Sequence, residues 1–124
     1  MPKQIRVVVV DDHDFFRSTL VRYLKGLQGL EIVGEAKNGR EALEISKKVS
    51  PHLVIMDVMM PEMDGIDACR AIKELNPEIK VVLFSMYKIE KSMNGGNNNA
   101  EICITKERLF RELPSIIEEL GRMQ

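Results

Sequence analysis

The segment Ile5-Arg6-Val7-Val8-Val9-Val10 is almost entirely β-branched and ends at two acids, Asp11 and Asp12. A strand with one face in water alternates apolar and polar residues, whereas a strand covered on both faces stays apolar along its length. This segment therefore predicts a strand inside a parallel sheet that is covered on both faces.

Similar apolar runs recur along the chain, and segments with helical spacing of apolar residues lie between them. The further strands are predicted at 31–36, 53–56, 80–84 and 102–105, and the helices around 16–27, 42–45, 66–75 and 109–120. Right-handed crossovers between parallel strands place helices on both faces of the sheet. The predicted fold is an α/β sandwich with a doubly wound, five-stranded parallel sheet of the flavodoxin type, in one domain over residues 1–124.

Composition excludes several classes of function. The net charge of −1 and the pI near 6.1 provide no basic field, so we expect no direct binding of nucleic acid by this chain. No stretch approaches the roughly 18 apolar residues that a membrane span needs. Cys69 and Cys103 show no metal-ligand spacing with His13 or His52. We expect a soluble, cytoplasmic protein with reduced cysteines and no membrane contact.

The predicted strand ends carry the residues that suggest chemistry, since sites in such folds form at the carboxyl edge of the sheet. These residues are Asp11 with Asp12, then Asp57, Ser85 and Lys106. Neighbouring carboxylates repel one another unless a cation lies among them, so the cluster predicts Mg²⁺, which prefers oxygen ligands. With Asp57 as nucleophile and Ser85 and Lys106 on the phosphoryl oxygens, the set suits phosphoryl transfer.

These residues stand in longer motifs: Val7-Val-Val-Val-Asp-Asp12, Asp57-Val-Met-Met-Pro-Glu-Met-Asp-Gly65, Phe84-Ser85 and Thr105-Lys106. In order and spacing the motifs resemble the receiver domains of response regulators in bacterial two-component systems, especially receivers that precede DNA-binding output domains. The resemblance covers almost the whole chain and implies a CheY-like sheet with strand order 2-1-3-4-5. It leaves open whether the chain is a stand-alone receiver or a truncated piece.

The resemblance implies that Asp57 accepts a phosphoryl group from a sensor histidine kinase, a phosphotransfer protein or a small phosphodonor. Ser85 and Lys106 would hold the phosphoryl oxygens. Phosphorylation adds about −1.5 to −2 charges and three acceptor oxygens, enough to change the surface near strands four and five and the last helix. The chain would thus be a switch that catalyses only its own phosphorylation and dephosphorylation, acting on a downstream effector that the sequence does not name.

The resemblance also implies a ligand set for Mg²⁺. Asp12 and Asp57 would bind the ion directly, Asp11 largely through water, and Met59 through its backbone carbonyl. His13, without a second histidine nearby, is expected to face solvent at a helix start, and Asp14 is expected to be a helix N-cap.

The chain departs from the family's pattern in three places. Helical spacing after strand four ends at Met93, and the Asn/Gly run at 94–99 predicts a short or disordered helix four with a mobile loop. Cys103 stands where receivers commonly carry Tyr or Phe, which leaves the coupling from phosphate to surface open. Met59 and Tyr87 cannot act as bases or orient water, which predicts slow hydrolysis of the phosphoaspartate.

Two other functions stay open at this stage. Asp12-His13-Asp14 fits the minimal Asp-x-Asp pattern of Mg²⁺-dependent phosphatases that use the first-strand Asp as nucleophile, although 124 residues scarcely provide the lid of such enzymes. The degraded helix four would also suit a pseudo-receiver, a scaffold for interaction or homodimerisation that does not depend on phosphorylation.

Overall fold

The computed structural model of the chain describes residues 4–86 and 100–122. From β1 to β4 strands and helices alternate as predicted, and each predicted strand is found with its ends within one residue of the expected positions. The elements are β1 (Ile5–Val10), α1 (Asp14–Lys25), β2 (Leu30–Ala36), α2 (Gly39–Val49), β3 (Leu53–Asp57), α3 (Gly65–Leu75), β4 (Lys80–Ser85), β5 (Ile102–Thr105) and α5 (Lys106–Arg122). The predicted short helix four and the mobile loop at 94–99 lie outside the described residues.

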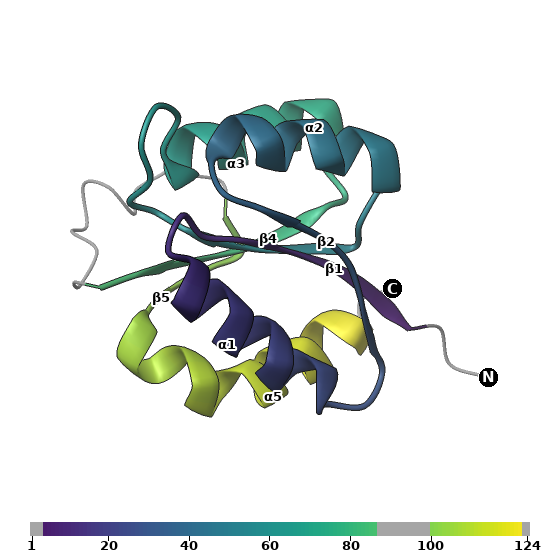
Figure 1. The fold of residues 1–124 in the computed structure, drawn as a ribbon. Helices are drawn as coiled ribbons and strands as arrows, with labels where there is room; N and C mark the ends of the chain where they lie inside the picture. Colours follow the sequence, from purple (N-terminus) through teal and green to yellow (C-terminus); the bar gives the residue numbers. More distant parts are fainter. Residues whose placement is uncertain (1–3, 87–99, 123–124) are drawn as a thin grey trace.

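The five strands form one parallel sheet in the order β2-β1-β3-β4-β5, which confirms the predicted topology. In Figure 1, α2 and α3 cover one face of the sheet, and α1 and α5 cover the other. In the sheet, β2 lies on one side of β1 and β3 lies on the other. The connection that follows β1 leads to β2 and the connection that follows β3 leads to β4, so these two connections diverge at the carboxyl edge. Such a switch in strand order is where α/β sheets form their sites.

The valines of β1 explain why this strand lies at the centre. Val7 and Val9 belong to the core between the sheet and the layer of α1 and α5, and Val8 and Val10 belong to the core under α2 and α3. All four side chains are fully buried. Burying a side chain of this size stabilises the fold by about 1.5–3 kcal/mol, so consecutive valines can fill both cores only in a doubly covered strand.

A hydrogen bond between side chain and backbone joins the two helices of the α1–α5 layer. Pro114 lies inside α5 and has no N–H to donate to the carbonyl of Phe110 one turn earlier. The hydroxyl of Tyr23 from α1 donates to that carbonyl at 2.8 Å. The Tyr23 ring also packs edge-on against the Phe110 ring, with centroids 5.1 Å apart. The Phe110 carbonyl, which lacks its usual helical N–H partner, therefore accepts a hydrogen bond that links α1 to α5.

The predicted N-cap role of Asp14 is wrong by one residue. The N-cap of α1 is His13, whose side chain makes no capping hydrogen bond, and Asp14 is the first helical residue. The Asp14 carboxylate instead accepts a hydrogen bond from Arg17 Nη2 at 2.8 Å. A short acidic side chain suits both the N-cap and the first turn, so the sequence alone did not separate the two positions. None of the described helices is long and apolar enough to cross a membrane.

Gly65, the first residue of α3, lies directly against the end of β3. Its N–H donates to the Val58 carbonyl at 2.8 Å. A Cβ at this position would stand 2.3 Å from the Asp57 carbonyl oxygen, a distance at which backbone must move. The glycine of the Asp57–Gly65 motif is therefore required by the close approach of the helix start to the strand that carries Asp57.

We expect Gly65→Ala to lower the free energy of unfolding by about 1–3 kcal/mol, because the added methyl group overpacks against backbone. Urea denaturation monitored by circular dichroism would measure the change. Gly26→Ala is the matched control, since a Cβ there would meet the Tyr23 carbonyl only at an ordinary 3.4 Å. Equal stability of the two variants would contradict this explanation of Gly65.

Candidate functional site

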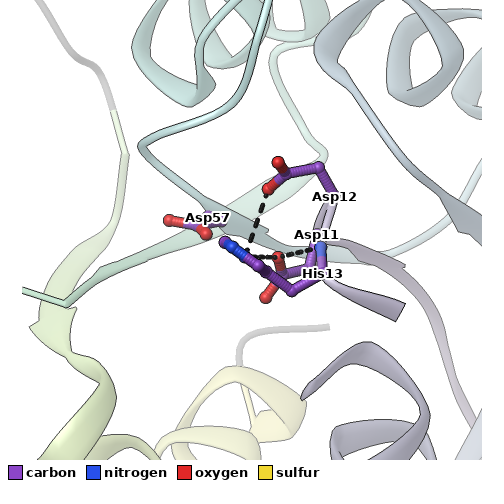
Figure 2. A group of neighbouring side chains, drawn as sticks. All are labelled: Asp11, Asp12, His13 and Asp57. Atoms are coloured by element: carbon purple, nitrogen blue, oxygen red, sulfur yellow. Dashed lines mark hydrogen bonds and ion pairs between the residues drawn. The ribbon is translucent and has the colours of Figure 1, made fainter. Parts of the chain in front are cut away.

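Four side chains from two neighbouring strand ends converge at the carboxyl edge of the sheet. Asp11, Asp12 and His13 form the connection between β1 and α1, and Asp57 is the last residue of β3. Figure 2 shows the four side chains gathered around one point. One ligand atom from each lies within 4.8 Å of the others. Because β1 and β3 are adjacent and parallel, their ends bring these carboxylates together as predicted.

Two carboxylate oxygens of this cluster lack a hydrogen-bond donor. Asp11 is fully buried, and its Oδ1 accepts the His13 N–H at 2.9 Å, but its Oδ2 accepts no hydrogen bond. Asp12 Oδ1 is likewise buried without a hydrogen bond, 3.4 Å from His13 Nδ1. Buried anionic oxygens without donors are costly, and oxygen is the ligand atom that Mg²⁺ prefers. This set of oxygen ligands therefore fits a hard divalent cation.

Asp57 is buried beside these acids, and the surroundings change its acidity. Its Oδ1 accepts the Met59 N–H at 3.1 Å. Burial raises the pKa of Asp57 to about 6, and the Met59 hydrogen bond opposes that shift; the charge of Asp11 raises the pKa further, and Lys106 lowers it. These surroundings thus disfavour the negative charge on Asp57, which a phosphoryl acceptor needs, unless a metal cation is present.

Lys106 brings a positive charge to the same place. As the first residue of α5 it extends from the end of β5, and its side chain is only 13% exposed. Its Nζ lies 3.6 Å from Asp11 Oδ2 and 3.7 Å from Asp57 Oδ2, over the ring of Phe16. The structure therefore places Lys106 beside the acids. Phe16 was predicted only as part of the apolar face of the helix around 16–27.

The other predicted positions lie at the same edge, with different surroundings. Ser85 is buried at the end of β4, in register with Thr105 of β5. Met59 offers its N–H to Asp57, while its carbonyl as a metal ligand stays a prediction. His13 does face solvent as predicted, yet its Nδ1 lies within 3.3 Å of Asp11 Oδ1, so it borders the cluster. Cys103 is half-buried opposite Leu83.

We expect Asp57→Asn to raise stability at neutral pH when no divalent cation is present. A folded-state pKa raised from 3.8 to about 6 means that Asp57 stabilises the fold fully below pH 3.8 and that this contribution is lost as the pH rises through about 6. Two pKa units correspond to about 3 kcal/mol, so the variant should gain up to that amount at pH 7.5 and almost nothing near pH 3.

Urea denaturation in EDTA across this pH range would measure the difference. Asp14→Asn is the control of opposite sign, because its hydrogen bond and ion pair with Arg17 lower the pKa of Asp14, so that its contribution is present above pH 3.8 and lost in acid. A stability difference between Asp57→Asn and the original chain that does not vary with pH would contradict the assignment.

The sequence matches the family described as the response regulator receiver domain over residues 7–118. It is 45% identical over 78 residues to the response regulator GacA of Pseudomonas protegens, a match that covers 63% of this chain and 37% of GacA. The chain thus spans well under half the length of that relative.

Many solved structures share the fold, and two serve as examples. The signal receiver domain of the putative response regulator NarL from Mycobacterium tuberculosis is 30% identical, with a TM-score of 0.88 over 99% of this chain and 100% of that chain. A chain of the CheX–CheY–BeF3–Mg²⁺ complex from Borrelia burgdorferi is 25% identical, with a TM-score of 0.77 over 92% and 90% of the two chains. Sequence, fold and acidic cluster agree, and this chain belongs to the response regulator receiver domains of two-component signalling, a family in which aspartyl phosphate and Mg²⁺ binding are typical.

Proposed function

We propose that this chain is a cytoplasmic switch in which Asp57 accepts a phosphoryl group in a Mg²⁺-dependent reaction. The donor would be the phosphohistidine of a sensor histidine kinase or phosphotransfer protein, or a small phosphodonor. The observation that carries the proposal is the convergence of Asp57 with two further buried or half-buried carboxylates and with Lys106 at one sheet edge. The only chemistry proposed is the chain's own phosphorylation and dephosphorylation.

The metal would be held by Asp12, Asp57 and the Met59 carbonyl, with Asp11 acting largely through water. The fit rests on the buried oxygens of Asp11 and Asp12 that accept no hydrogen bond. When bound, Mg²⁺ would supply positive charge that offsets the repulsion among these carboxylates and the negative charge of the phosphoryl oxygens. The raised pKa of Asp57 supports the same assignment, since the carboxylate is poorly compensated by protein groups alone.

The chain's own groups would position the reaction. The Met59 N–H holds Asp57 Oδ1 and so limits rotation of the nucleophilic carboxylate. During transfer a bond forms between a carboxylate oxygen and phosphorus while the bond from phosphorus to the donor breaks. Lys106 Nζ, already 3.7 Å from Asp57 Oδ2, would follow the negative charge onto the phosphoryl oxygens. Ser85 at the next strand end would offer its hydroxyl to the same oxygens and so draw in the surface of β4, β5 and α5.

Exposed apolar side chains at this edge support a protein as donor. Phe15 is 83% exposed, Met59 62% and Met86 63%, and each follows the carboxyl end of a strand that borders the site. Large apolar side chains exposed around a site suit contact with another protein. The CheX–CheY complex is an example of a similar fold bound to a protein partner.

The geometry disfavours a phosphatase of the Asp-x-Asp kind. Such an enzyme would need the carboxyl of Asp14 beside that of Asp12. The Asp14 side chain is 72% exposed and bound by Arg17, outside the cluster of four ligand groups. The pseudo-receiver scaffold is separated from the switch by the experiment that follows.

Incubation with Mg²⁺ and acetyl phosphate should add one phosphoryl group to Asp57, measured by intact mass and peptide mapping. We expect the adduct to vanish with EDTA or with Asp57→Asn, because the first removes the compensating cation and the second the nucleophile. Asp14→Asn is the matched control and should be modified as fully as the original chain. A chain that takes no phosphoryl group under any of these conditions would be a pseudo-receiver scaffold.

The phosphoaspartate should hydrolyse slowly, with a half-life of minutes or longer. The Met59 side chain is largely exposed and its thioether can neither take a proton from water nor orient it. Met59→Asn should shorten the half-life, because an amide can hydrogen-bond the attacking water. Loss of the phosphoryl group followed by mass spectrometry after removal of the donor would measure both rates, and a half-life of seconds in the original chain would refute the prediction.

A further inference from the structure

We propose that Phe16 is a positioning residue for Lys106: the face of its ring holds the ammonium beside Asp11 and Asp57, ready for the transferred phosphoryl group. The inference rests on the proposed function of the site and adds a residue to it. Its basis is the surroundings of one nitrogen atom, Lys106 Nζ.

Lys106 Nζ lies among two anions and two aromatic rings. It is 4.2 Å from the centroid of the Phe16 ring and 5.7 Å from that of Phe84. Its two ion pairs with Asp11 and Asp57, at 3.6 and 3.7 Å, are longer than hydrogen bonds. The closely packed Phe16 ring therefore forms a third side of the space around the ammonium and, unlike the carboxylates, carries no net charge.

A neutral ring is well suited to this task. A lysine side chain is long and flexible, and the negative face of an aromatic ring attracts an ammonium within about 6 Å. A carboxylate in the same place would also fix Lys106, but it would compete with the phosphoryl oxygens for the positive charge. The ring fixes the position of the ammonium and leaves its charge available.

Packing from three elements fixes the ring itself. Phe16 belongs to α1, and its ring centroid lies 5.5 Å from that of Phe84 in β4 and 5.7 Å from that of Phe110 in α5. Phe84 directly precedes Ser85 in the sequence, and Phe16 lies in the first turns of α1, shortly after Asp12. The ring is thus held between two segments that lead into the site.

Phe16 also contributes to the core, so the test must separate positioning from packing. Phe16→Leu and Phe110→Leu each remove one ring from the same aromatic cluster, but of these two rings Phe16 alone faces Lys106. We expect Phe16→Leu to slow phosphorylation by acetyl phosphate on the order of tenfold at saturating Mg²⁺. Phe110→Leu keeps an apolar side chain against the Phe16 ring and leaves that ring over Lys106, so its rate should stay within about twofold of the original chain. Phe16→Tyr, which keeps the ring face, should restore most of the rate.

Fluorinated phenylalanines at position 16 sharpen the experiment. Added fluorine atoms weaken the negative face of the ring with little change in its size, so the logarithm of the rate should fall stepwise with each fluorine. Mg²⁺ affinity, measured by titration of the same variants, should stay within about twofold, because the metal ligands are unchanged. A rate independent of fluorination, or equal losses for Phe16→Leu and Phe110→Leu, would overturn the proposal and leave Phe16 as core packing.

A separate measurement covers the case in which the original chain takes no phosphoryl group. The proton shifts of the Lys106 ε-methylene in NMR spectra report the ring current of the nearby Phe16, with a smaller contribution from the more distant Phe84. The shift should move toward the random-coil value in Phe16→Leu and be retained in Phe110→Leu. Failure of phosphorylation with this shift intact would remove the proposed function but keep the contact; an unshifted methylene in the original chain would remove the positioning role.

Discussion

Electrostatic repulsion among buried carboxylates is the constraint around which the site is organised. Asp11 and Asp57 lie out of water at adjacent strand ends, with Asp12 half-buried beside them. Backbone N–H groups of His13 and Met59 and the ammonium of Lys106 offset part of this cost. The part of the cost that is not offset is seen in the raised pKa of Asp57 and in the buried oxygens of Asp11 and Asp12 that accept no hydrogen bond. The doubly covered sheet, with its dry valine strand, supplies the stability that lets the fold carry such a site.

The features that sequence predicted are those that depend on local pattern and on topology. Four consecutive valines exclude a strand with one face in water, and the alternation of strands and helices along the chain then predicts a doubly wound sheet. Parallel strands end at the same edge, so Asp11, Asp57 and Lys106 could be placed together although 46 and 49 positions separate them along the chain. These predictions needed no side-chain packing, which is why they agree with the structure.

The features that sequence missed arise from packing between elements distant in the chain. Helical spacing marks Phe16 as apolar, but its place over Lys106 depends on how α1 and α5 meet the sheet. The same holds for Tyr23, whose hydroxyl partner is 87 residues away. His13 was set aside as solvent-facing, which is correct for most of its ring; the direction of one nitrogen toward Asp11 is a rotamer choice that no sequence pattern encodes.

The hydrogen bond between the Tyr23 hydroxyl and the Phe110 carbonyl affects how α1 and α5 can move. Pro114 removes the N–H that would otherwise occupy this carbonyl, and the hydroxyl of α1 takes its place. Sliding α5 along its axis would break that bond and separate the edge-to-face rings of Tyr23 and Phe110, so the two helices resist displacement relative to each other. A movement that starts at Lys106, the first residue of α5, would therefore be shared by α1 and carried as a tilt of the whole helical layer against the sheet.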